Sequence, residues 1–350
     1  TVFFAGMGLG QILFGPWSDV VGRKLPIMLG FAFFIVGCVL TIYAENFDSM
    51  LVGRFLQGFG AAAPRIIGVA LVRDMYHGRE MARVMSFVMS VFILVPMFAP
   101  AIGQLVIYLF DWKAIFIVFL LLVLIVAVWF WLRLPETLSI ESRSRISLRQ
   151  LVTDVGFVIT HRVALGYTVV MGLVFGGFVG YLSSSQQILQ NLYALGDRFT
   201  LYFGVLAGAI GLSTLVNARL VMRFGMRRLC ALALSGVVVL GFPFLFWTLL
   251  YSGQPPFIGF MCYLLLTFFL FGILFGNLNA LAMEPLGHIA GLGSAVVGSV
   301  STLISVMLGI WVAGSYSHSV VPLVSAFSVL GMLSLGLMYW IERLPAVHPE

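Results

Sequence analysis

The chain has 350 residues, of which 61% are hydrophobic and 9% charged, and its formal net charge is +6. A mean hydropathy of +1.10 excludes a soluble globular protein. The apolar runs are long and unbroken, which also excludes an outer-membrane barrel, whose strands alternate over about ten residues. We therefore predict an all-α polytopic membrane protein.

The apolar stretches define the predicted helices, because a spanning helix needs about 20 mainly apolar residues. Eleven stretches qualify, near residues 2–15, 26–44, 49–72, 83–108, 114–133, 162–181, 200–221, 229–250, 256–281, 291–313 and 320–341. The longest polar stretch follows the fifth of them. We expect an N-terminal bundle at 1–134, a cytoplasmic central linker at 135–160 and a C-terminal bundle at 161–350.

Residues 15–24 read GPWSDVVGRK and separate the first two apolar stretches. We expect Gly15 and Pro16 to end the first helix and Gly22 to form a tight turn. Asp19 is expected where a neighbouring helix N-terminus or an arginine neutralises it. The simpler interpretation is a short turn with positive charges on the cytoplasmic side. It explains the two basic residues at the end of the segment, but not the aspartate or the paired glycines.

The stretch at 49–72 carries the costliest residues for a membrane. Arg54, Gln57, Ala61 and Arg65 recur at helical spacing, so they form one polar stripe. Charged groups at membrane depth cost several kcal/mol unless they face a wet cavity or a partner. We predict that the stripe faces a central cavity. The alternative is that the two arginines extend to opposite membrane surfaces.

The stretch at 83–108 contains two prolines and a glycine within about two helical turns, namely Pro96, Pro100 and Gly103. This spacing favours a bend and close packing against a neighbouring helix. The three cysteines lack metal-ligand spacing, and the five histidines fall at loops or helix ends. We therefore expect no catalytic residue, no metal site and no cofactor.

The positive charges predict the orientation of the chain in the membrane. If residues 15–24 are cytoplasmic, fifteen of the nineteen lysines and arginines lie on that side and two on the other. The remaining two lie within the helix at 49–72. This asymmetry explains the net positive charge, so we infer no nucleic-acid partner from it.

The two bundles show signs of being repeats. Gly22 with Arg23 and Lys24 recurs 203 positions later as Gly225 with Arg227 and Arg228. The same offset places the counterpart of 162–181 upstream of residue 1, so we expect a further helix before this chain begins. None of the thirteen acidic residues lies in the middle of a predicted helix.

Together these motifs resemble the major facilitator superfamily. RFLQGFGAAAPRIIGVALVRDMY (54–76), APAIGQ (99–104), DWKAIF (111–116) and LPET (134–137) are similar to the Bcr/CflA group of drug:proton antiporters. The resemblance implies two six-helix bundles, of which eleven helices are present here and the first is missing. In the resembled family an acidic residue of that first helix commonly serves proton coupling, so the resemblance implies that the coupling carboxylate lies on the missing helix. It covers essentially the whole chain, densely in the first half and mostly by hydropathy in the second.

The resemblance also implies roles for particular residues. The latch residues on the cytoplasmic face are Gly15, Asp19, Gly22, Arg23, Lys24 and Asp74, and the expected partner of Asp19 is GLGSA at 291–295. Asp74 is a candidate partner for Arg23. The family has a basic residue after the aspartate, where this chain has Val20.

Two further sets follow from the family patterns. Arg54 and Gln57 match the R-x-x-Q-G motif linked to proton coupling, and Arg65 is added from the stripe. The antiporter kink falls at Pro96, Ala99, Pro100 and Gly103, where the family pattern G-P-x-x-G-G is matched with two substitutions.

The function that follows is drug:proton antiport by alternating access across a bacterial inner membrane. The expected partners are a lipophilic or aromatic drug, protons and membrane lipid, and the expected state is a monomer. The alternative is a symporter of the same fold that imports a small metabolite. A membrane-embedded enzyme is disfavoured because the sequence has no cluster of nucleophilic or metal-binding residues.

Overall fold

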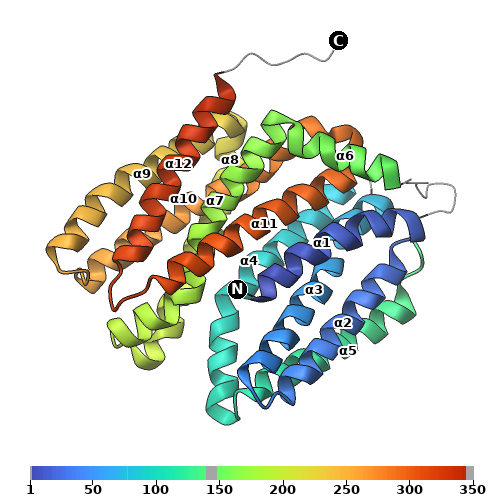
Figure 1. Cartoon of the computed structure of the whole chain (residues 1–350), viewed down its shortest axis with the longest axis horizontal. Helices are drawn as coiled ribbons and strands as arrows, with labels where there is room; N and C mark the ends of the chain where they lie inside the picture. Colours follow the sequence, from blue (N-terminus) through green and yellow to red (C-terminus); the bar gives the residue numbers. More distant parts are fainter. Residues whose placement is uncertain (1, 77, 139–147, 344–350) are drawn as a thin grey trace. The chain divides into compact units, whose positions relative to one another are not determined.

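The computed structural model describes residues 2–76, 78–138 and 148–343, where every regular element is a helix (Figure 1). The first five helices are α1 (Val2–Val21), α2 (Lys24–Ile42), α3 (Phe47–Met75), α4 (Gly78–Leu109) and α5 (Lys113–Arg133). They are followed by α6 (Leu148–Thr160), α7 (Arg162–Gln186), α8 (Phe199–Phe224), α9 (Met226–Leu250), α10 (Phe257–Met283), α11 (Ala290–Gly314) and α12 (Val321–Glu342). A π-helical turn extends α7 at Gln187–Leu192, and short 3-10 turns lie at Gly196–Arg198 and Glu284–Ile289.

Each predicted apolar stretch falls on one of these helices, but the predicted number of eleven spans is not reached. Within the described residues, α2, α3, α5 and α7 to α12 are long and apolar enough to cross a membrane. Helix α1 is long enough, but its hydropathy is lowered by Gln11 and by the polar end Ser18–Asp19. The described residues of α4 contribute a shorter apolar segment, Phe98–Leu109. The chain is therefore multi-pass, as the composition predicted.

The stretch predicted as a linker contains a helix, α6. The signal was present in the sequence, because the apolar residues at 148, 151, 152, 155 and 158 follow a helical period. Its length of 13 residues is too short to span a membrane. Val158 is 2% exposed, whereas the next apolar residue, Ile159, is 45% exposed. Helix α6 is thus amphipathic.

The described chain clusters into two compact units. One comprises Thr1–Val158 with His288–Leu303, and the other comprises Ile159–Gly287 with Ile304–Glu350. In the first unit, α3 packs against both α1 and α2. Glycines make this close approach possible: a Cβ at Gly10 would lie 2.6 Å from the carbonyl oxygen of Phe59, and one at Gly37 would lie 2.7 Å from that of Gly53. Small residues let helix backbones approach in this way.

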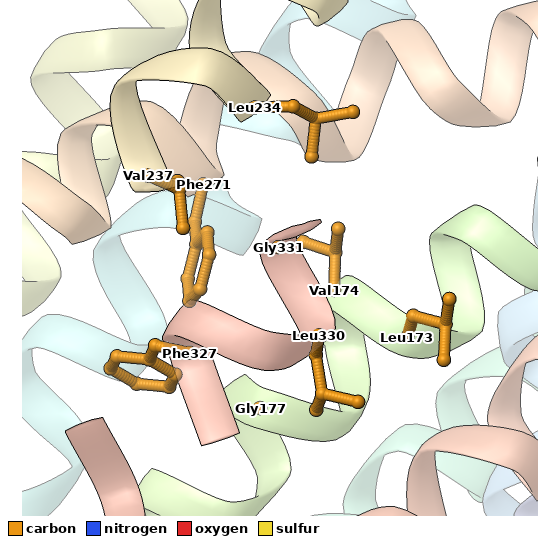
Figure 2. A pocket seen from close by; sticks show the side chains of 9 residues that line it. All are labelled: Leu173, Val174, Gly177, Leu234, Val237, Phe271, Phe327, Leu330 and Gly331. Carbon is orange, nitrogen blue, oxygen red and sulfur yellow. The ribbon is translucent and has the colours of Figure 1, made fainter. Parts of the chain in front are cut away.

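In the second unit, α10 packs against α7, α8 and α9, while α12 packs against α7 and α9. Aromatic rings fill the space between α7 and α10, where Phe268 lies 4.7 Å from Tyr181 and 5.6 Å from Phe178 between ring centroids. A void of about 10 Å³ remains in this core, and Figure 2 shows its apolar lining. Such a space holds at most one water and offers it no polar partner, so it is a packing defect and not a ligand site.

Candidate functional site

The turn between α1 and α2 forms at Gly22, as the sequence predicted. Its φ of 107° lies in the left-handed region that favours glycine, and its N–H donates to the carbonyl oxygen of Ser18 at 3.2 Å. The prediction that Gly15 and Pro16 end the first helix is wrong, because α1 continues through both to Val21. A proline removes one backbone donor, but this helix ends only next to Gly22, which adopts the left-handed conformation.

Arg23 is the centre of a charge cluster at this turn. Its Nε donates to Asp74 Oδ2 at 2.9 Å, and Nη1 donates to Asp19 Oδ1 and, at 2.9 Å, to Ser18 Oγ. The Arg23 side chain is 4% exposed, while those of Asp19 and Asp74 are 24% and 14% exposed. The structure thus brings together three of the predicted latch residues, including the expected pair of Arg23 with Asp74.

The two carboxylates also act on the protonation of Arg23. Partial burial alone would lower the pKa of its guanidinium, but the hydrogen bonds and charges of Asp74 and Asp19 outweigh burial and raise that pKa. Stability that depends on a raised pKa is lost only as the pH rises through the folded-state pKa. For an arginine this lies far above physiological pH, so Arg23 itself remains charged at physiological pH.

Glu136 completes the cluster and was not singled out as a site residue from the sequence. Its carboxylate accepts from the backbone N–H of Arg23 at 2.8 Å and from that of Lys24 at 3.1 Å. Backbone N–H groups at the N-terminus of a helix such as α2 have no partner within the helix, and a negative charge is favourable there. Lys24 Nζ in turn donates to the Trp131 carbonyl oxygen at 2.9 Å. The sequence does show an acidic residue, Glu136 of LPET, shortly after α5. No local pattern, however, indicates that it binds backbone groups more than 100 positions earlier.

The segment expected to receive Asp19, GLGSA at 291–295, lies beside α1. The contact described is one turn earlier than predicted, at Gly15, where a Cβ would lie 2.9 Å from the Ala295 methyl. Further along the same pair of helices, a Cβ at Gly298 would lie 2.6 Å from Gln11 Oε1. The start of α11 therefore packs along α1 within the first unit.

Arg54 and Gln57 are hydrogen bonded to each other on α3, with Nη1 donating to Oε1 at 2.6 Å. The Arg54 guanidinium lies 4.9 Å from the ring centroid of Phe3 and 5.6 Å from that of Phe116. The half-buried charge is thus held by an amide oxygen and two aromatic faces. Among the described contacts of Arg54, none is with a carboxylate.

Gln57 does not face a cavity, contrary to the prediction for the polar stripe. It is 0% exposed, and its Nε2 points into α2, 3.3 Å from Thr41 Oγ1 and 3.6 Å from Cys38 Sγ. Thr41 is itself fully buried and donates to the Gly37 carbonyl oxygen at 2.8 Å. Helical periodicity placed Gln57 on a face of α3, but the position of α2 was needed to know what covers that face.

Arg65, at the other end of the stripe, is exposed, and its Nη1 lies 3.1 Å from Met7 Sδ. Phe3 and Met7 both belong to α1. The two arginines of the stripe therefore both contact α1, whereas Gln57 between them contacts α2.

The predicted antiporter kink falls on α4, which is a helix from Gly78 to Leu109 and continues through Pro96 and Pro100. Ala99 is exposed, and a Cβ at Gly103 would meet no described atom within 4 Å. Close packing at Gly103 therefore stays a prediction.

The second unit contains a corresponding charge cluster that we did not predict. Arg227, at the start of α9, pairs with Glu284 at 3.0 Å and with Glu342 at 3.4 Å. Tyr167 of α7 donates its hydroxyl to the Glu342 carboxylate. In both units a basic residue at the start of one helix binds acids near the ends of two others. Gly22 recurs 203 positions later as Gly225, and this repeat could have been used to locate the second cluster.

Comparison with known proteins identifies the family. The model of the Major Facilitator Superfamily matches residues 1–310. The chain belongs to this superfamily. Its members are transporters, so the chain is a multi-pass membrane transporter.

Several members are similar over nearly the whole chain. The bicyclomycin resistance protein homolog of Haemophilus influenzae is 28% identical over 97% of this chain and 85% of that protein. The multidrug transporter MdfA of Yersinia pestis is 26% identical over 99% of this chain and 84% of that protein. The xylose transporter XylE from E. coli shares the fold, with a TM-score of 0.74 at 15% identity over 100% of this chain and 87% of that one.

Proposed function

We propose that this transporter exports drug-like molecules in exchange for protons across the inner membrane of a bacterium. The observation that carries the proposal is the extent of the similarity to one relative named for bicyclomycin resistance and one named as a multidrug transporter, which align with 97% and 99% of the chain. The motifs of residues 54–76 and 99–104 support the same group. Aromatic and lipophilic compounds are the expected substrates.

The proposal is tested by transport into inside-out vesicles from cells that express the transporter. With an acidic lumen, vesicles are expected to accumulate ethidium, a planar aromatic cation, and a protonophore is expected to abolish the accumulation. Bicyclomycin is a second probe. If neither compound accumulates, and intact cells instead take up a small metabolite along the proton gradient, the importing symporter is the correct function.

Arg54 and Gln57 are the proposed coupling residues in the described part of the chain. A fixed positive charge at membrane depth interacts strongly with any proton or cation that passes it, because the surrounding medium screens it weakly. The position of Arg54 is set by its bond to Gln57, which is anchored to α2 through Thr41. Arg65 is assigned to the same path.

Replacing Arg54 with methionine is expected to reduce gradient-driven ethidium transport by about tenfold or more, because a loss of about 1.4 kcal/mol in the transition state already has that effect. The volume of the side chain is kept and its charge removed. Arg198→Met, at an exposed arginine outside the spanning helices, is the control and is expected to transport normally. Unchanged transport by Arg54→Met at normal membrane levels would remove Arg54 from the mechanism.

Gly15, Asp19, Gly22, Arg23, Lys24 and Asp74 are proposed to form a latch that is made and broken as access alternates. Asp19 is the more exposed of the two carboxylates that pair with the Arg23 guanidinium, so it can exchange partners at the lower cost. The antiporter role of Pro96, Ala99, Pro100 and Gly103 remains a prediction from the family pattern.

Asp19→Asn is expected to slow transport several-fold while leaving the amount of inserted protein unchanged. The amide still accepts a hydrogen bond from Arg23 but no longer carries the charge. The measurement is the initial rate of ethidium transport at matched membrane levels, with Asp48→Asn, in the first turn of α3, as the control. Transport by Asp19→Asn at the wild-type rate contradicts the latch.

A further inference from the structure

The N-terminus of α7 and the C-terminus of α12 meet at a group of arginine and aromatic side chains in the second unit. The Arg162 guanidinium lies over the Trp340 ring, 3.8 Å from the ring centroid. Two of its nitrogens, Nε and Nη2, are buried and have no hydrogen-bond partner in the described structure. Stacking orients this cation, but it leaves much of its hydrogen-bonding capacity unused.

One face of α12 is hollowed at the same place. Gly336, Tyr339, Trp340 and Arg343 line a cavity of about 390 Å³ and follow one another at the spacing of a single helix face. A Cβ at Gly336 would meet no described atom within 4 Å, so the glycine leaves this face open. Tyr339 and Trp340 are 50% and 55% exposed. The cavity therefore has an apolar wall and a cationic end.

The charges around the cavity favour an anion. The nearest acid along the chain, Glu342, is bound by Arg227 at 3.4 Å and by the hydroxyl of Tyr167, and Glu284 is bound by Arg227 as well. Neither carboxylate is recorded in contact with Arg162 or Arg343. Arg343 is exposed at the end of α12. Two arginines at this site thus remain uncompensated by the acids next to them.

The occupant follows from where the face lies. A spanning helix with tyrosine and tryptophan near its end places those rings at the level of the lipid headgroups. Basic side chains at that level bind anionic headgroups, and most of the basic residues of this chain are assigned to this side of the membrane. Acyl chains can pack along Gly336 and Tyr339 while a phosphate reaches Arg343, with the charge of Arg162 next to it behind Trp340.

We propose that Arg162, Arg343 and Trp340 form a binding site for an anionic phospholipid of the cytoplasmic leaflet. Arg343, which lines the cavity, holds the phosphate group, and the charge of Arg162, stacked on Trp340 beside the cavity, adds to the attraction. The glycine notch in α12 receives the upper part of an acyl chain. The site rests only on the chain spanning a membrane and does not depend on the transported substrate.

The test is lipid binding by the purified transporter in a mild detergent, after its native lipid has been removed. Phosphatidylglycerol and phosphatidylcholine with identical acyl chains are titrated in turn, and bound lipid is counted by native mass spectrometry. We expect the wild-type protein to prefer phosphatidylglycerol. Each arginine near a membrane surface contributes about a fivefold preference, so Arg162→Gln with Arg343→Gln is expected to reduce the preference about thirtyfold.

The matched control replaces two exposed arginines at the same membrane end, Arg223→Gln with Arg228→Gln, and is expected to keep the preference. Equal loss in the control would mean that general surface charge attracts the lipid, and equal binding of both lipids by the wild type would also overturn the proposal. Displacement of the lipid by millimolar inorganic phosphate would indicate a site for free anions instead. If the double variant fails to fold, Arg343→Gln alone, at an exposed helix end, is expected to lower the preference about fivefold.

Discussion

Gly58→Ala is expected to destabilise the first unit by about 3 kcal/mol or more, the upper range for overpacking a well-packed interior. A Cβ at Gly58 would overlap the carbonyl oxygen of Phe3 in α1, and a backbone atom cannot rotate away as a side chain can. Gly58 is also the glycine of the R-x-x-Q-G pattern. The structure therefore explains why this position of the pattern is glycine. At Gly58 the backbones of α1 and α3 are in contact and leave no room for a side chain.

The measurement uses the cysteines of the chain as reporters. Cys38 in α2 is 0% exposed, and it is the only thiol left after Cys230→Ser and Cys262→Ser. A thiol-reactive dye then labels the protein only when the first unit opens. In this background Gly58→Ala is expected to lower the midpoint of thermal labelling by roughly 5–10 °C.

Gly68→Ala is the control, because Gly68 lies on the same helix and a Cβ there would meet no described atom within 4 Å. Alanine is a better helix former than glycine by about 1 kcal/mol. The control is therefore expected to keep or slightly raise the midpoint. Equal falls for the two variants would show that loss of glycine in α3, and not contact with α1, causes the effect.

Arg23→Met is expected to destabilise the first unit by about 3 kcal/mol, the usual cost of removing one partner from a buried ion pair. Without the guanidinium, Asp19 and Asp74 are left as neighbouring negative charges, and Ser18 Oγ loses a donor. The same Cys38 labelling assay measures the change. Because Arg23 stays charged at both values, the loss is expected to be equal at pH 6 and pH 8.

Arg133→Met removes an exposed arginine from the last turn of α5 in the same unit and is expected to change stability by less than about 0.5 kcal/mol. Asp74→Asn is expected to have an intermediate effect, since Arg23 still has Asp19. A midpoint for Arg23→Met equal to that of Arg133→Met would show that the cluster contributes nothing to folding.

The site was partly predictable from local pattern. The turn at Gly22 and the pairing of Arg23 with Asp74 were expected, because glycine marks left-handed turns and a family motif placed the two charges. The capping of α2 by Glu136 was not expected, because it joins residues 113 positions apart. Periodicity placed Gln57 on a face of α3 that was expected to line a cavity, but its burial against Thr41 depends on where α2 lies.

The sequence by itself determined that this protein crosses a membrane several times and where its apolar helices lie, because hydropathy and backbone hydrogen bonding act over neighbouring residues. It also indicated the repeat and the family. Only the tertiary structure decided which groups neutralise the charges and which glycines contact a backbone. Those contacts join helices that are distant in the chain, and a local pattern shows what a residue can bind but not which partner the fold brings to it.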